Sequence, residues 1–139
     1  MNVLVVSSFG VIKDIFRSVL KQQSFIQDVR LINPSEIKSA DVRIGHKFDN
    51  NLDLIIYDLD TTCYCSDRKI RAIEEAMNLS TKRGNNSKIL FVASEAQLAT
   101  TQEKVSFIDD YLIIKPFRIK DVIHKLKDIN SQSLLINTL

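Results

Sequence analysis

The chain has few of the residues on which several common kinds of site depend. It contains three glycines, two histidines and two cysteines among 139 residues. Nucleotide sites in α/β proteins use glycine-rich turns, because only there can the backbone approach phosphate. The turn at residues 7–10 holds one glycine and matches neither the Walker nor the GxGxxG pattern, and Ser7 and Ser8 give only weak support to an FMN site. We therefore disfavour a nucleotide-binding domain.

The cysteines and histidines do not form a recognisable metal or catalytic motif. Cys63 and Cys65 are separated by one residue, which is a strained spacing for a disulfide. A zinc site usually needs four Cys or His ligands, and no histidine lies near the two cysteines in sequence. His46 and His124 fall in no hydrolase motif. We expect two free thiols, and a redox role for them stays open as an alternative.

Long apolar runs and a strong excess of one charge are also lacking. The net charge is +2, from 19 basic and 17 acidic residues, which gives little support for nucleic-acid or membrane binding. No apolar run approaches the roughly 18 residues that a membrane span needs, and residues 1–3 lack the positive segment of a signal peptide. We expect a cytoplasmic protein without a membrane partner.

Short apolar runs alternate with segments of helical periodicity. The runs predict five strands, at residues 3–6, 29–32, 54–57, 89–93 and 112–114. Predicted helices cover residues 11–20, 67–79, 95–103 and 118–129, and a further one begins at residues 33–36. Repeated βα units imply a parallel sheet with helices on both faces. We assign residues 1–130 to one domain and residues 131–139 to a tail or linker stub.

Apolar stripes support the predicted helices at residues 11–20 and 67–79. The members of the first stripe are Val11, Ile12, Ile15, Phe16, Val19 and Leu20, and those of the stripe in residues 67–79 are Ile70, Ile73 and Met77. We expect these stripes to face the core.

Two strands end in residues of opposite charge. Asp58 closes the apolar run 52–57, and Lys115 with Pro116 closes the run 111–114. Ligands of an open α/β sheet bind outside the carboxyl ends of its strands, so both side chains are expected at one crevice. Opposite charges about 4–6 Å apart stabilise each other's ionised forms. The sequence therefore predicts an Asp58–Lys115 ion pair.

With an aspartate in DLIIYD and a lysine–proline in IIKPF, the five βα units resemble the receiver domain of bacterial response regulators, over about residues 2–129. The resemblance implies a single flavodoxin-like α/β domain whose parallel sheet has the strand order 2-1-3-4-5. It also implies that Asp58 is the equivalent of the phosphoacceptor and that Lys115 pairs with the phosphoryl group. The Thr or Ser that ends the fourth strand in the family falls at Ala93, with Ser94 one residue later.

The positions that hold Mg²⁺ in this family differ in this chain. Two acids after the first strand are replaced by Ser7 and Ser8, and the residue whose carbonyl binds the metal is Asp60. Mg²⁺ prefers carboxylate oxygens, and the two serines remove two negative charges. We expect Mg²⁺ binding at Asp58 and Asp60 to be weak or absent, and no other cofactor.

Other family positions also depart from the pattern. Thr62 and Ser66 replace a proline and a glycine, while the switch aromatic is replaced by Leu112, with Tyr111 one residue earlier. One step along a strand turns a side chain to the opposite face, so Tyr111 is not a direct substitute. The family's interaction face joins the fourth helix, fifth strand and fifth helix. Its members here are Leu98, Tyr111, Leu112, Ile113 and Lys120.

We interpret the chain as an atypical receiver, or pseudo-receiver, and not as an enzyme. It would act in signal transduction through protein–protein contacts, without the usual Mg²⁺-dependent phosphorylation. The expected partner is a histidine kinase, a downstream effector or a second copy, and nucleic acid would be reached only through an output domain that these residues do not include. Two alternatives stay open: a divergent receiver phosphorylated on Asp58, and a redox-sensing module that uses Cys63 and Cys65.

Overall fold

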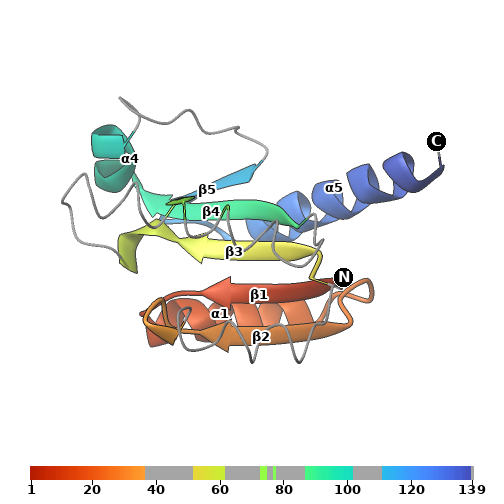
Figure 1. Ribbon diagram of the computed structural model, residues 1–139, viewed down its shortest axis with the longest axis horizontal. Helices are drawn as coiled ribbons and strands as arrows, with labels where there is room; N and C mark the ends of the chain where they lie inside the picture. The colour runs from red at the N-terminus through yellow and green to blue at the C-terminus, as the bar shows by residue number, and fades with distance from the viewer. Residues whose placement is uncertain (37–51, 62–72, 75–76, 78–86, 102–110, 139) are drawn as a thin grey trace.

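The computed structural model describes residues 1–36, 52–61, 73–74, 77, 87–101 and 111–138. Its strands are β1 (Asn2–Val6), β2 (Asp28–Ile32), β3 (Leu54–Asp58), β4 (Lys88–Ser94) and β5 (Leu112–Lys115). They form one parallel sheet in the order β2-β1-β3-β4-β5 (Figure 1). The predicted strands and their order are confirmed. Every residue of β3 is buried, as expected for the central strand of a sheet covered on both faces.

Helices pack on the two faces of this sheet. The described helices are α1 (Gly10–Lys21), the 3₁₀ turn η1 (Leu59–Thr61), α4 (Glu95–Thr101) and α5 (Ile119–Thr138). Phe16 of α1 and Leu126 of α5 lie in one core cluster with Val5 and Ile56, so both helices cover the same face. Leu98 of α4 belongs to the opposite cluster, with Tyr57. Neighbouring strand residues Ile56 and Tyr57 thus serve different cores, because strand side chains alternate.

The last helix is longer than the sequence predicted. We expected a helix to residue 129 and a tail from residue 131, whereas α5 continues to Thr138 and projects beyond the sheet (Figure 1). Between Ile119 and Thr138 there is no glycine or proline to end the helix. The Tyr111 hydroxyl, just before β5, donates a hydrogen bond to Gln132 Oε1 at 2.6 Å, so α5 is held at a residue past the predicted end of the helix.

Two apolar residues predicted to face the core are instead exposed. Val11 is 71% exposed, because it lies in the first turn of α1, which starts beyond the end of β1. Met77 is exposed, while Ile73 from the same predicted helix is buried. Most of that helix, residues 67–79, lies outside the described residues.

The predicted helix start at residues 33–36 is described only in its first turn. The Glu36 side chain accepts a hydrogen bond from the Asn33 backbone N–H at 2.6 Å, as a capping box requires. The Asn33 side chain, however, accepts from Lys13 Nζ at 2.6 Å. The first turn therefore has one half of the predicted capping box, and its other side-chain partner comes from α1.

Candidate functional site

Asp58 and Lys115 meet at the carboxyl end of the sheet. Asp58 is the last residue of β3 and pairs with Val92 of β4, while Lys115 ends β5 and pairs with Ser94, two residues further along β4. Lys115 Nζ lies 3.0 Å from Asp58 Oδ1 and 3.1 Å from Oδ2. The Asp58 side chain is buried, with 1% of the residue exposed. The ion pair predicted from the sequence is confirmed.

One of the two serines that follow β1 contacts Asp58. Ser7 is buried, and its hydroxyl donates to Asp58 Oδ2 at 2.9 Å. The same Ser7 oxygen accepts the Phe9 backbone N–H at 3.1 Å. Ser8 is exposed. Ser7 therefore supplies a neutral donor to Asp58 at a position where an acid would have supplied a second negative charge.

Asp60, in the turn η1, shares Lys115 with Asp58. Its Oδ2 lies 3.0 Å from Lys115 Nζ, and its backbone N–H donates to Asp58 Oδ1 at 3.0 Å. The Asp60 carboxylate also accepts the Ser94 hydroxyl at 2.9 Å and the Ser94 backbone N–H at 3.0 and 3.2 Å. The sequence suggested Asp60 only as a weak metal ligand, and these contacts were not predicted. Its position two residues beyond Asp58, at the strand end that faces Lys115, was the available indication.

Ser94, and not Ala93, provides the hydroxyl at the end of β4. Ala93 is buried in the core. Ser94 contacts Asp60, and its oxygen accepts the Gln97 backbone N–H at 3.2 Å in the first turn of α4. Gln97 Nε2 donates to the Leu59 carbonyl at 3.0 Å. Hydrogen bonds through Ser94 and Gln97 therefore join η1 to the start of α4.

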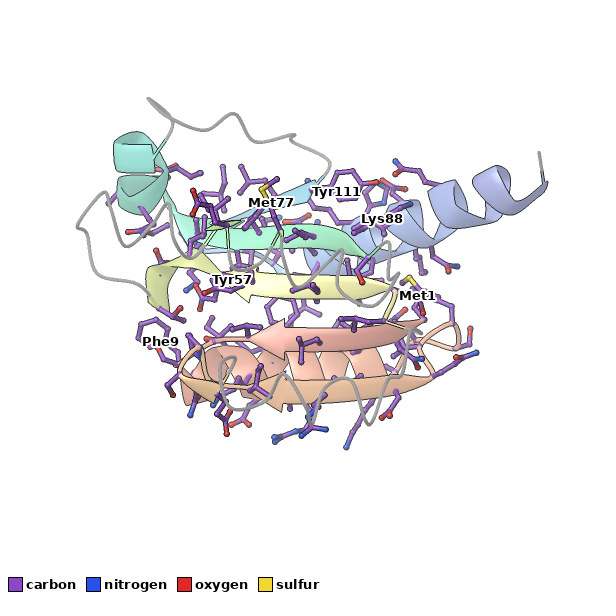
Figure 2. All side chains as sticks on the ribbon, in the orientation of Figure 1. Met1, Phe9, Tyr57, Met77, Lys88 and Tyr111 are labelled. Carbon is purple, nitrogen blue, oxygen red and sulfur yellow. The ribbon has the colours of Figure 1, made fainter. Side chains whose placement is uncertain are left out.

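Burial dominates the electrostatics of Asp58. The pKa of Asp58 is raised above its ordinary value because burial disfavours the carboxylate. Hydrogen bonding and charge from Lys115, the Ser7 hydroxyl and the Asp60 N–H oppose this rise. With both acids ionised and Lys115 protonated, the three charged groups sum to −1. Lys115 Nζ also lies 5.2 Å from the centre of the Phe9 ring, at the end of the sheet to which the strands point (Figure 2).

The donor set of this site does not fit Mg²⁺ held as in response regulators. Mg²⁺ takes carboxylate oxygens in octahedral geometry, but both carboxylates here contact the Lys115 ammonium. The Ser7 hydroxyl donates its proton to Asp58 and adds no charge. Within the described ranges, no three His, Cys, Asp or Glu side chains are grouped so as to hold a metal ion.

The predicted interaction face is only partly at the surface. Leu98, Leu112 and Ile113 are 4%, 7% and 3% exposed, so their side chains do not face a partner in this packing. The reason is that β5, although an edge strand, is covered on both faces: Leu112 belongs to the cluster of α4 and Ile113 to that of α5. Tyr111 is half-buried and Lys120 is exposed.

An exposed apolar residue on the same edge strand was not predicted. Ile114 is 44% exposed and borders a groove of about 460 Å³ between β5 and the start of α5. The groove is also lined by Pro116, Phe117, Asp121 and Lys125. This edge therefore presents an apolar strip with charged residues at its border.

Several residues to which the sequence analysis assigned a role or a family position lie outside the described part of the chain. They are His46, Thr62, Cys63, Cys65, Ser66 and Ile70. The redox alternative for the two cysteines therefore stays a prediction. Among the helices that the structure describes, none combines the length and hydrophobicity that a membrane span requires.

Comparison with known proteins supports the fold. No protein-family model matches the sequence, and no curated protein is detectably similar to it. Among solved structures, the response regulatory domain of protein mrkE from Klebsiella pneumoniae is similar with a TM-score of 0.64 and 16% identity, over 95% of this chain and 97% of that one. A two-component transcriptional regulator AraC from Clostridium phytofermentans has a TM-score of 0.68 and 12% identity, over 100% and 99% of the two chains. A response regulator receiver domain protein from Clostridium thermocellum has a TM-score of 0.58 and 16% identity, over 96% and 98%. The chain therefore has the flavodoxin-like fold of response-regulator receiver domains.

Proposed function

We propose that this protein is a receiver-like signalling module that acts through protein–protein contacts and does not need Mg²⁺-dependent phosphorylation of Asp58. It is not an enzyme in this proposal. The observation that carries the proposal is the shared lysine: the Lys115 ammonium is held by the carboxylates of Asp58 and Asp60 at 3.0 Å each.

Phosphoryl transfer to Asp58 is poorly supported by this arrangement. The reaction depends on positioning and on neutralising the charge of the transferred group. Asp58 would have to attack an anionic donor in a site where two carboxylates already share one lysine, and that lysine is engaged by Asp60. Asp58 is also buried, which limits the access of a phosphoryl donor to its carboxylate.

A surface for a protein partner is present at the edge of the sheet. Ile114 is exposed on β5, and the neighbouring groove is lined by Phe117 and bordered by Asp121 and Lys125. Apolar surface with a polar rim is typical of protein interfaces. The partner in this proposal is a histidine kinase or a downstream effector, with a second copy of the chain as a further possibility.

An amide NMR titration with Mg²⁺ and then beryllofluoride tests the proposal. We expect no site-specific shifts at the amides of Ser7, Ser94 and Lys115 in the wild type. Asp58→Asn is the variant in which any phosphoryl-like binding must be lost. Asp53→Asn is the matched control, because Asp53 is an exposed acid that precedes the first residue of β3, at the end of the strand opposite to Asp58.

Either result is decisive for Asp58. Unchanged spectra support a phosphate-independent module and direct attention to its protein partner. Shifts at these amides that disappear in Asp58→Asn and persist in Asp53→Asn would refute the proposal. They would establish instead the divergent, phosphorylatable receiver in which Asp58 accepts the phosphoryl group.

A further inference from the structure

The Asp60 carboxylate is bound in the way that proteins bind an oxyanion. Its two oxygens accept the Ser94 hydroxyl at 2.9 Å, the Ser94 backbone N–H at 3.0 and 3.2 Å, and a contact from Lys115 Nζ at 3.0 Å. A hydroxyl, an amide and an ammonium that converge on one anion form a charge-assisted binding cradle. The residue that fills this cradle belongs to the chain itself.

The cradle adjoins Asp58 directly. Lys115 Nζ is 3.0 Å from an oxygen of each carboxylate, and the Asp60 backbone N–H donates to Asp58 Oδ1 at 3.0 Å. An anion attached to Asp58 would need a local donor for neutralisation, and the Lys115 ammonium is the positive charge that contacts Asp58. Asp60 therefore occupies the cation on which such an anion would depend.

We infer that Asp60 is a built-in anion, which permanently takes the place of an added anionic group and fixes η1 to α4. This inference rests on the proposed function, since it explains how the domain holds one arrangement without phosphorylation. It concerns the regulation of the same site, and it assigns to Asp60 a role that the sequence did not indicate.

The contacts connect the charge of Asp60 to the position of α4. Ser94 binds the Asp60 carboxylate and, through the same hydroxyl oxygen, accepts the Gln97 N–H in the first turn of α4. Gln97 Nε2 returns to the Leu59 carbonyl beside Asp60. Removing the carboxylate breaks the first of these links, so the start of α4 should open more often while the sheet stays intact.

Hydrogen exchange at single amides tests this inference without Mg²⁺ or beryllofluoride. In Asp60→Ala we expect the Gln97 amide to exchange about tenfold faster than in the wild type, because charge-assisted hydrogen bonds are lost. Asp60→Asn keeps one acceptor oxygen and loses the charge, so it should lie between the two. The Leu90 amide, in the centre of β4, is the internal reference for global unfolding. Its exchange rate should be the same in these variants as in the wild type, while that of Gln97 changes.

Asp53→Ala is the matched control, because it removes an acid that accepts one backbone N–H, from Asn2, near the opposite end of the sheet. Its Gln97 exchange should equal that of the wild type. Equal Gln97 exchange in Asp60→Ala and the wild type would overturn the inference. So would wild-type exchange in Asp60→Asn, since a neutral side chain would then suffice.

Formate provides a second test of the anion itself. Added to Asp60→Ala, with chloride at the same ionic strength as the control, formate should slow the Gln97 exchange by refilling the cradle. Failure of formate to do so, with the faster exchange present, would overturn the role of the anion. The proposed function is judged separately by the beryllofluoride titration of the wild type, so the two can fail independently.

Discussion

Replacement of Lys115 by methionine is expected to leave two carboxylates without their shared cation. Lys115 Nζ contacts Asp58 at 3.0 and 3.1 Å and Asp60 at 3.0 Å. Methionine retains an unbranched apolar side chain, so packing along β5 is largely preserved. The change therefore isolates the loss of the ammonium group.

The magnitude follows from the burial of the partners. Breaking a buried ion pair by removing one partner costs about 3–5 kcal/mol, because the other charge is left uncompensated. The Lys115 and Asp60 side chains keep 20% and 15% of their surface exposed, so water offsets part of this cost. We expect a loss of about 3 kcal/mol in the free energy of unfolding at pH 7, which corresponds to a decrease in Tm of roughly 10 °C.

Urea denaturation followed by circular dichroism measures this loss, with Lys120→Met as the matched control because Lys120 is exposed on α5. Asp58→Asn in the Lys115→Met background removes one of the stranded charges and should recover at least about 1 kcal/mol. The reasoning is refuted by Lys115→Met being as stable as Lys120→Met. It is also refuted if Asp58→Asn brings no recovery.

Three further outcomes are expected from the same measurement. The pKa of Asp58 is raised above 3.8 in the folded protein, so over this pH range the folded state binds a proton at Asp58 that the unfolded state has lost. The stability of the wild type relative to Asp58→Asn should therefore fall as the pH rises from 3.8 through the folded-state pKa, and be constant at higher pH. A relative stability that rises with pH would contradict this. Ser7→Ala should lose about 1–3 kcal/mol, because a buried hydroxyl contact to Asp58 disappears, while Ser8→Ala, at an exposed position, should be neutral. Leu126→Ala, in the core, should lose about 2–5 kcal/mol, whereas Val11→Ala, at a position 71% exposed, should stay within about 0.5 kcal/mol of the wild type; equal losses would contradict the packing described for α5.

Most of the fold could be predicted because strands buried in a parallel sheet appear in the sequence as continuous apolar runs. The run 54–58 is continuously apolar up to Asp58, and all of β3 is buried. The opposite charges of Asp58 and Lys115 at two strand ends were sufficient to predict their pairing, since parallel strands place their carboxyl ends at one edge. The strand order came from the resemblance and not from the periodicity.

The remaining features depend on geometry that a sequence pattern does not contain. The Asp60–Ser94 contact joins residues 34 positions apart and depends on the turn η1 that follows β3. The burial of Leu112 and Ile113 depends on helices that cover both faces of an edge strand. The sequence pattern does not indicate how far a helix covers an edge strand. The extension of α5 depends on the Tyr111–Gln132 contact as well as on helix propensity.

The presence of both Asp58 and Lys115 does not by itself indicate phosphorylation. Removing one member of a buried ion pair leaves the other charge without a partner and destabilises the fold, whereas removing both together can leave the free energy of unfolding nearly unchanged. Substitution of Lys115 is therefore costly in this fold for reasons of stability alone, because it leaves the carboxylates of both Asp58 and Asp60 without their shared cation.

The serine at position 7 is under a different constraint. As a hydroxyl it donates to Asp58 and satisfies the Phe9 N–H, so it stabilises the carboxylate without a metal. An acid at this position would add negative charge beside Asp58 and would need a cation to be tolerated. Under the proposed function, Ser7, Asp58 and Lys115 thus form a set that needs no Mg²⁺, and binding the metal as response regulators do would require acids near Asp58 together with release of Lys115 from Asp60.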